Sequence, residues 1–270
     1  MYAVGSLLSG EDVGVGNAPI AVLEIEGTIL SSKDALETIK KIQKNKDVKA
    51  VVVRIDSPGG AVGPSQEIYL ALKKLRETKH VVMSMASVAA SGGYYIAIAG
   101  EKIFALPGTV TGSIGVLMQY VNVEELINFA KVKAEILKAG SHKDVGSMLR
   151  PMTPEDRAFL DGFLAHMHSQ FKTAVREARG FTEEEIDRIA DGRIYSGEQA
   201  KQLKLIDEIG GFDDAVAEAA KLGGVQGEPE VYYPGRKKDT LIQQLLREDA
   251  QSLIKKIYFD LKQSSPMYLM

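Results

Sequence analysis

The chain has 270 residues, of which 45% are hydrophobic and 26% are charged. This length lies between one large domain and two small ones and is ample for a well-buried core. The formal net charge of −3 provides no basic field for nucleic acid, and the absence of cysteine excludes disulfides, thiolate metal sites and a cysteine nucleophile.

Apolar blocks of strand length alternate with segments of helical period, a pattern typical of an α/β domain built from repeated βα units. Residues 21–25 and 50–55 predict the first two strands, and Ser31 is placed to cap a helix between them. The second strand is nearly continuous in β-branched residues, as expected of a strand covered on both faces. The run Ser57-Pro58-Gly59-Gly60 ends it.

After this break, Ser65 is placed to cap a second helix, and residues 81–85 predict a third strand that leads toward Ser91. A helix is expected to begin at Gly92. Further elements are predicted in chain order: strands over 103–106 and 114–121, a short helix over 123–130, and a strand over 134–137.

Thr153 is expected to start a long helix, because Glu155 and Asp156 fall in its first turn, where the helix dipole favours negative charge. The remaining predicted elements are helices over 183–190, 197–203 and 213–222, followed by one strand around Val231.

Ser91 lies in Ala89-Ala90-Ser91-Gly92-Gly93, between small residues and at a predicted junction from strand to helix. Small neighbours leave room for a substrate backbone. A serine hydroxyl needs a nearby base to become a nucleophile, and histidine is the usual one. The first histidine downstream is His142, directly beside Lys143. Lysine is therefore our candidate base, with His142 as its competitor.

Five segments of the chain resemble, in order and spacing, the signal peptide peptidase A family of Ser/Lys proteases, and together they cover about residues 18–225. They are Asp56-Ser57-Pro58-Gly59-Gly60, Ala90-Ser91-Gly92-Gly93-Tyr94-Tyr95, Thr111-Gly112-Ser113-Ile114-Gly115-Val116, His142-Lys143-Asp144 and Asp191-Gly192-Arg193-Ile194-Tyr195-Ser196-Gly197. The resemblance implies a caseinolytic protease/crotonase-like α/β fold, with Ser91 as nucleophile and Lys143 as general base. It also implies a serine endopeptidase without a cofactor or metal, which cleaves hydrophobic peptides such as released signal peptides.

A lysine amine titrates near 10.4 in water, so a lysine base working near neutrality requires a pKa lowered by about 3, at a cost of roughly 4 kcal/mol. Burial among apolar groups can lower it. Ser113, in a glycine turn, is placed to orient the neutral amine. Asp144 adjoins Lys143, and because a paired carboxylate would raise the lysine pKa, we expect Asp144 to point elsewhere.

The backbone N–H groups of Gly60 and Gly92 are the candidate oxyanion donors, because glycine permits close approach and a helix start adds its positive end. Gly59, Gly60 and Ala61 are the candidate substrate-binding positions, where an extended peptide can pair with the backbone. By contrast, Tyr94 and Tyr95 are expected to be core or rim aromatics.

Two other function classes stay open. A crotonase-type acyl-CoA enzyme shares the fold and the oxyanion loops, but it needs no nucleophilic serine. A noncatalytic peptide-binding scaffold would keep the glycines yet have no use for both Ser91 and Lys143. Acyl-CoA binding separates the first from a peptidase, and labelling by a fluorophosphonate separates the second.

The chain divides by pattern into residues 1–17, a Ser/Lys peptidase domain over 18–225 and a C-terminal extension over 226–270. Residues 1–17 contain no apolar run long enough to cross a bilayer. Because the family usually carries an N-terminal anchor, we expect either a chain trimmed after its anchor or a soluble relative. The resemblance implies membrane association through that missing anchor, with an extracytoplasmic catalytic domain.

The extension alternates apolar and charged residues at helical period over 241–261, which predicts a helix that docks on a partner surface. The apolar end, 266–270, is either a disordered terminus or a strand that lies in a groove of the same chain or a neighbour. From the resemblance we also expect a homo-oligomer, in which rings or domes enclose the active sites.

Overall fold

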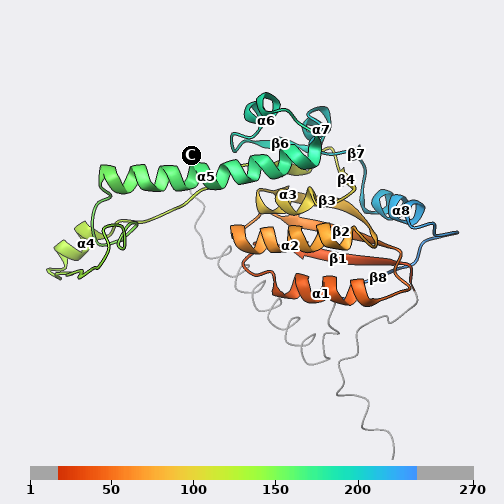
Figure 1. Ribbon diagram of the computed structural model, residues 1–270, viewed down its shortest axis with the longest axis horizontal. Helices are drawn as coiled ribbons and strands as arrows, with labels where there is room; N and C mark the ends of the chain where they lie inside the picture. The colour runs from red at the N-terminus through yellow and green to blue at the C-terminus, as the bar shows by residue number, and fades with distance from the viewer. Residues whose placement is uncertain (1–17, 236–270) are drawn as a thin grey trace, which may run out of the picture.

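The computed structural model describes residues 18–235, and it shows an eight-stranded sheet flanked by helices (Figure 1). The strands are β1 (Ile20–Glu26), β2 (Ala50–Ser57), β3 (His80–Ala90), β4 (Lys102–Ala105), β5 (Val110–Gly112), β6 (Ile194–Ser196), β7 (Glu208–Ile209) and β8 (Val231–Tyr232). The helices are α1 (Lys33–Lys44), α2 (Val62–Leu75), α3 (Gly92–Ala97), α4 (Glu124–Phe129), α5 (Pro154–Arg179), α6 (Glu183–Ile189), α7 (Gly197–Gln202) and α8 (Phe212–Leu222).

The main path of the sheet runs β6-β5-β3-β2-β1-β8, and every pairing in it is parallel except that of β5 with β6. Strand β3 is long enough to have two neighbours on the same side. Its residues 82–85 pair with β4, and its residues 88–90 pair with β5. The carboxyl ends of β2, β3 and β5 therefore meet at one edge of the sheet.

Both faces of the sheet are covered, which explains the continuous apolar runs in β2 and β3. Val51 and Val53 of β2 pack into the larger core cluster with α1, α2 and α3, whereas Val52 faces a second cluster that includes Ala215 and Ala219 of α8. The alternation has the period of two that a strand imposes. The predicted βα architecture is confirmed.

Helix α5 joins this body to a projecting segment, residues 117–164, which we call the arm (Figure 1). The arm contains α4, the turns that follow it and the first part of α5. No hydrophobic residue between Ile114 and Phe171 is buried. Of the 17 exposed large hydrophobic residues in the described chain, 12 lie between Leu117 and Phe163. The arm thus has no core of its own.

Two predicted caps are wrong. Helix α1 is capped at Ser32 rather than Ser31, whose hydroxyl only accepts a hydrogen bond from the N–H of Lys33 at 3.2 Å. Ser65 lies inside α2, because that helix already starts at Val62, and its hydroxyl donates to the carbonyl of Ala61.

The predicted strands over 114–121 and 134–137 are also wrong. Both segments are extended or irregular and join no sheet in the described structure. An apolar run of this length predicts a strand, but the strand forms only where a neighbouring strand accepts its backbone hydrogen bonds. The arm provides none, so local propensity is not realised.

Thr153 caps α5 as predicted, with a capping box in which Thr153 and Asp156 exchange hydrogen bonds at 3.1 Å. Within residues 18–235, none of the helices combines the length and apolarity needed to span a membrane. The predicted helix over 241–261 and the apolar end over 266–270 lie outside the described residues, as do residues 1–17.

Gly60 offers a test of the backbone packing at the edge of the sheet. A Cβ atom at Gly60 would lie 2.2 Å from the carbonyl oxygen of Ile29 and 2.7 Å from its nitrogen, and neither backbone atom can move without breaking the bridge between the two residues. We expect Gly60→Ala to lower the free energy of unfolding by about 2 kcal/mol or more. Denaturant unfolding followed by circular dichroism measures this change.

Gly63→Ala is the matched control, because Gly63 is exposed in α2 and a Cβ there meets no atom within 4 Å. This variant should be neutral or more stable by at most about 1 kcal/mol. Equal stability of the two variants would contradict the packing described for Gly60.

Candidate active site

Ser91 occupies a sharp turn between the end of β3 and the start of α3. Its backbone has φ 52° and ψ −118°, a conformation that a residue with a side chain seldom adopts. The N–H of Ser91 donates to the carbonyl of Gly112 at 2.9 Å, and its own carbonyl accepts from the N–H of Tyr95 at 2.8 Å. Such strain, of order 1–3 kcal/mol, persists where the surroundings enforce it and is concentrated at functional sites.

The turn at Ser91 packs against the turn at Gly59 with no space for another side chain. A Cβ atom at Gly59 would lie 2.6 Å from the nitrogen of Gly92 and 2.9 Å from the Cβ of Ser91. Gly59 also has φ 97°, which favours glycine. The pair of glycines after β2 is therefore required by close approach to the serine.

Two backbone N–H groups beside Ser91 are available to a ligand. The N–H of Gly60 has no hydrogen-bond partner among the described residues. Gly92 is the first residue of α3, where a helix leaves its N–H groups without intrahelical acceptors. A Cβ atom at Gly92 would lie 3.3 Å from the nitrogen of Gly60, so the two groups are close together.

Two hollows meet at Ser91. The larger, of about 490 Å³, is an open groove between the turn that contains Gly59 and Gly60 and the segment that contains Ser113 and Gly115. The smaller, of about 30 Å³, lies under α5 and is closed by Tyr95, Met167 and Phe171. Ala61 lines neither hollow; its N–H donates to the carbonyl of Ile29 at 2.8 Å.

Ser113 lies across the larger hollow from Gly59, at the carboxyl end of β5. Its φ of 51° is again in the left-handed region, and its N–H donates to the carbonyl of Arg193 at 2.8 Å. The structure therefore brings Ser113 to the serine. It shows no contact between Ser113 and Lys143.

Helix α5 contributes residues to the site that the sequence did not indicate. Met167 and Phe171 close the small hollow. The Nε2 atom of His168 lies 3.0 Å from the carbonyl oxygen of Ile114, within hydrogen-bond distance. Among the described residues, this hydrogen bond fixes the start of the segment 114–121, whose Gly115 and Val116 line both hollows. In the sequence, the one signal for this contribution of α5 is the polar ring of His168 between the apolar Met167 and Phe171.

Lys143 lies in a tight turn of the arm, and its side chain is exposed. It lines neither hollow at Ser91. Asp144 points away from it, as predicted: its carboxylate accepts hydrogen bonds from Lys138 at 2.5 Å and Arg150 at 2.8 Å. These two cations hold the pKa of Asp144 well below its usual range, mainly through the Arg150 hydrogen bond.

The neighbouring tyrosines are core and rim aromatics, as predicted. Tyr94 is fully buried, its hydroxyl donates to the carbonyl of Leu205 at 2.8 Å, and burial raises its pKa. Tyr95 is partly exposed in the small hollow, with its ring against Tyr69 and Phe171 at centroid distances of 5.0 and 4.9 Å. Because burial raises the pKa of both hydroxyls, neither loses its proton near neutral pH.

His166 and His168 contact different partners, Gln170 and the carbonyl of Ile114. Among residues 18–235, no group of three or more histidine, aspartate or glutamate side chains is arranged to hold a metal ion. What the site provides chemically is a hydroxyl on a strained turn, two free N–H donors and an adjoining groove.

The chain is similar in sequence to known proteases. Peptidase family S49 matches residues 73–226, and the Clp protease family matches residues 23–112. A putative protease, slr0021 of Synechocystis sp., is 41% identical over 208 residues, which are 76% of this chain and 75% of that protein.

Two further relatives carry more specific names. Protease 4 of Salmonella typhi is 35% identical over 234 residues, 86% of this chain but 36% of that protein. A putative signal peptide peptidase SppA of Enterococcus faecium is 32% identical over 217 residues, 75% of this chain and 63% of that protein. The fold is thus a Clp protease-like α/β fold, and the chain belongs to peptidase family S49.

Proposed function

We propose that the protein is a serine endopeptidase in which Ser91 is the nucleophile and Lys143 the general base. The observation that carries this proposal is the strained turn at Ser91, packed against Gly59 and open to both hollows. A turn that exposes a hydroxyl at a strand-to-helix junction is the geometry on which acyl-transfer enzymes of other folds rely. The membership in a peptidase family supports peptide bonds over acyl-CoA thioesters as the substrate.

In the proposed reaction, the neutral amine of Lys143 takes the proton of the Ser91 hydroxyl while the oxygen attacks the scissile carbonyl. The N–H groups of Gly60 and Gly92 stabilise the oxyanion of the tetrahedral adduct. The ammonium then returns its proton to the leaving amine, which departs and leaves an acyl-serine. Water then attacks the ester carbonyl while the same amine takes its proton; the bond to the Ser91 oxygen breaks, the ammonium returns the proton to that oxygen, and the carboxylic acid product is released.

Lys143 has to come from a second copy of the chain or from a rearranged arm, because it lines no hollow at Ser91. The arm supports the first route. It contains most of the exposed large apolar side chains of the described chain, and none of its own large apolar side chains is buried. Chain segments without a buried core gain order by packing on a partner.

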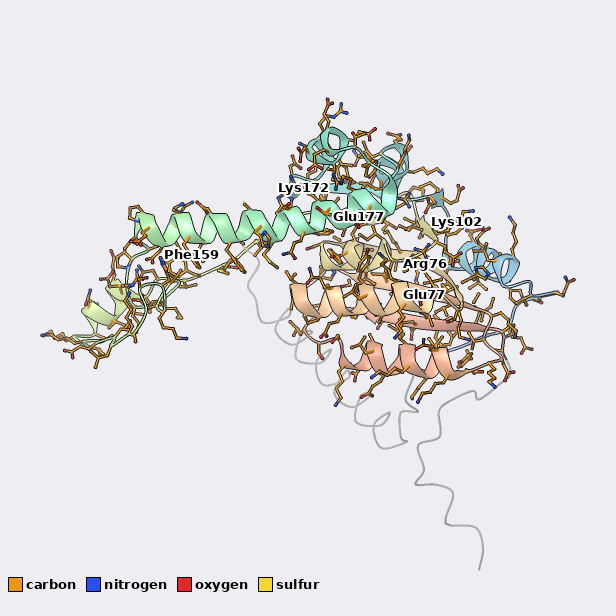
Figure 2. The ribbon with its side chains drawn as sticks, viewed as in Figure 1. Arg76, Glu77, Lys102, Phe159, Lys172 and Glu177 are labelled. Atoms are coloured by element: carbon orange, nitrogen blue, oxygen red, sulfur yellow. The ribbon has the colours of Figure 1, made fainter. Side chains whose placement is uncertain are left out.

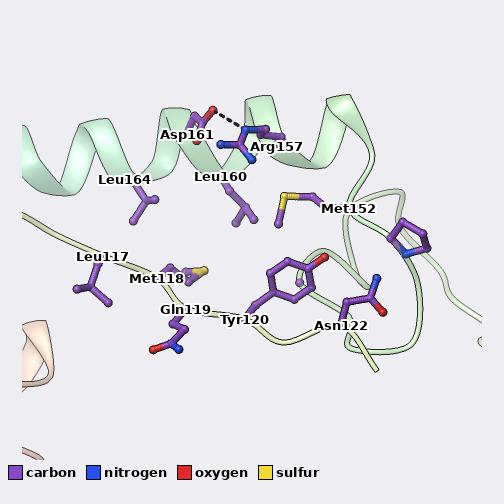
Figure 3. A pocket seen from close by; sticks show the side chains of 12 residues that line it. Leu117, Met118, Gln119, Tyr120, Asn122, Met152, Arg157, Leu160, Asp161 and Leu164 are labelled. Carbon is purple, nitrogen blue, oxygen red and sulfur yellow. Dashed lines mark ion pairs between the residues drawn. The ribbon is translucent and has the colours of Figure 1, made fainter. Parts of the chain in front are cut away.

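The partner surface on the arm is a groove of about 800 Å³ between the 117–122 segment and the first turns of α5 (Figure 3). Leu117, Met118, Leu160 and Leu164 line it, with Leu160 and Leu164 directed from α5 toward the segment, and Arg157 pairs with Asp161 at 3.8 Å on the same helix. We propose that arms of neighbouring copies pack in a ring or dome, so that Lys143 of one copy and Ser91 of the next form one site.

The substrates proposed are extended hydrophobic peptides, such as released signal peptides. The backbone of 115–117, which makes no hydrogen bond within the described chain, and the turn at Gly59 and Gly60 border the larger hollow and can bind a peptide main chain between them. Ser113, at the same groove, is proposed to orient the lysine amine. We further propose that the peptidase acts at a membrane, with its catalytic site on the extracytoplasmic side.

Ser91→Ala and Lys143→Ala should each lower kcat/KM for a peptide substrate at least 1,000-fold while leaving the circular dichroism spectrum unchanged. If the dyad forms between copies, co-refolded mixtures of the two inactive variants regain activity, because some interfaces then pair an intact serine with an intact lysine. In the control, wild-type chains labelled at the active site are refolded together with unlabelled wild-type chains, and the appearance of mixed assemblies shows that subunits exchange.

An active Lys143→Ala variant would remove the lysine from the mechanism. Inactive mixtures, with exchange demonstrated, would place both residues of a dyad in one chain.

Turnover should rise with pH, by about tenfold per pH unit on the acid limb, because only the neutral amine of a lysine accepts a proton. The measurement is kcat as a function of pH, made at saturating concentrations of two substrates, a peptide ester and the corresponding peptide amide. A limb with a midpoint near 6.5 would instead indicate an imidazole base.

The small hollow is expected to receive the side chain on the acyl side of the scissile bond, and its volume of about 30 Å³ favours small residues such as alanine or serine. Met167→Ala should enlarge it and shift the kcat/KM ratio for leucine over alanine at that position by at least tenfold. Ser169→Ala, at an exposed position of the same helix, is the control. An unchanged ratio in Met167→Ala would place this subsite elsewhere.

A further inference from the structure

Lys143 is flanked on both sides by residues that are fixed to α5, although its own side chain is exposed. The turn that contains it, residues 140–147, is closed by three backbone hydrogen bonds: Lys143 to Gly140, Val145 to His142 and Ser147 to Asp144. Turns of this kind at the surface are mobile unless side chains fix them to a regular element. Here two separate contacts do so.

The first contact is a stacked pair of rings. The imidazole of His142 lies on the ring of Phe159, with centroids 4.9 Å apart and planes 9° from parallel. Phe159 belongs to the first part of α5, which lies in the arm and extends beyond the body (Figure 2). Stacking uses the face of the imidazole and needs neither of its nitrogens.

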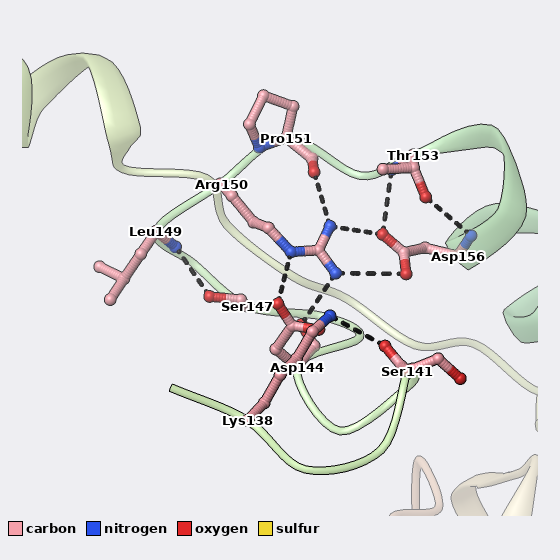
Figure 4. A network of polar contacts seen from close by, with 9 residues as sticks. All are labelled: Lys138, Ser141, Asp144, Ser147, Leu149, Arg150, Pro151, Thr153 and Asp156. Atoms are coloured by element: carbon pink, nitrogen blue, oxygen red, sulfur yellow. Dashed lines mark hydrogen bonds and ion pairs between the residues drawn. The ribbon is translucent and has the colours of Figure 1, made fainter. Parts of the chain in front are cut away.

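The second contact is an ionic network centred on Arg150 (Figure 4). The guanidinium donates to both oxygens of Asp156, at 2.5 and 3.2 Å, and through Nε to Asp144 at 2.8 Å. Asp156 is in turn the third residue of α5 and part of its capping box with Thr153. Asp144 is thereby connected through one planar cation to the first turn of a 26-residue helix.

The same network also occupies the carboxylate nearest in sequence to Lys143. Lys138 donates to one oxygen of Asp144 and Arg150 to the other. A carboxylate free to pair with Lys143 would favour its ammonium form and oppose its action as a base. The network therefore has two effects: it fixes the turn, and it keeps a negative charge from the amine.

We infer that the His142–Phe159 stack and the Asp144–Arg150–Asp156 network form a splint that positions Lys143 to reach the serine of a neighbouring copy. The inference rests on the proposed function, because it concerns how the base of that reaction is presented. It assigns His142 a positioning role through its ring face, so the competitor for the base becomes part of the support. Arg150 and Asp144 are positioning residues, since they act through the turn.

The stack is tested with two substitutions at one position. His142→Ala removes the ring and should lower kcat at least tenfold, with KM changed by less than twofold, because binding of the peptide is left intact. His142→Phe keeps a ring that can stack but has no nitrogen, and it should recover kcat to within about threefold of the wild type. The acid limb of the pH profile should stay in place in His142→Phe.

A His142→Phe variant as inactive as His142→Ala, with both assembled as judged by size-exclusion chromatography, would overturn the assignment and favour an imidazole base. Wild-type turnover in both variants would also overturn it.

The network is tested with Arg150→Met, which releases Asp144 from α5. We expect a tenfold or greater fall in kcat and an acid limb moved to higher pH, because the released carboxylate can then pair with Lys143. The double variant Arg150→Met, Asp144→Asn should move the limb back without restoring kcat in full. Arg176→Met, which loses an arginine–carboxylate pair with Glu183 at the body end of α5, is the matched control and should behave as the wild type.

An Arg150→Met variant with wild-type kcat and an unmoved limb would contradict the splint. The Lys143→Ala variant distinguishes failure of the proposed lysine base from failure of the splint. Activity in that variant refutes the lysine base itself, whereas its inactivity combined with normal His142→Ala and Arg150→Met variants refutes the splint alone.

Discussion

The structure depends on one steric constraint, the contact of two backbone turns at the carboxyl edge of the sheet. The turn after β2 and the turn after β3 approach so closely that a single added methyl group at Gly59 would overlap the nitrogen of Gly92. This contact holds Ser91 in its strained conformation and aligns two N–H groups beside it. Parallel pairing of β2 with β3 brings the two turns together, since parallel strands end at the same edge.

The body of the molecule was predictable because its signals agree at every level. In β2, a β-branched run is bounded by a proline and two glycines, and the strand lies where both of its faces are covered. Around Ser91, small residues on both sides predict a tight turn, and the structure confirms the helix that begins at Gly92. Such elements need only information that is local in sequence.

The arm was less predictable because none of its apolar residues is buried within the described part of the chain. Residues 114–121 have strand propensity, yet a strand requires neighbours to accept its hydrogen bonds, and the described chain supplies only His168. The contribution of Met167 and Phe171 to the small hollow was missed for a related reason. They are far from Ser91 in sequence, and only the path of α5 across α3 brings them to it.

Helix α5 links two regions that would otherwise be independent. Phe171 is buried in the body, whereas the splint holds the helix start about 17 residues away, a span of about 26 Å at 1.5 Å per residue. A stiff rod of that span is a lever: a tilt of about 5° at Phe171 displaces the far end by about 2 Å. Since Met167 and Phe171 also line the small hollow, an occupant that presses on them is mechanically connected to the tip of the arm.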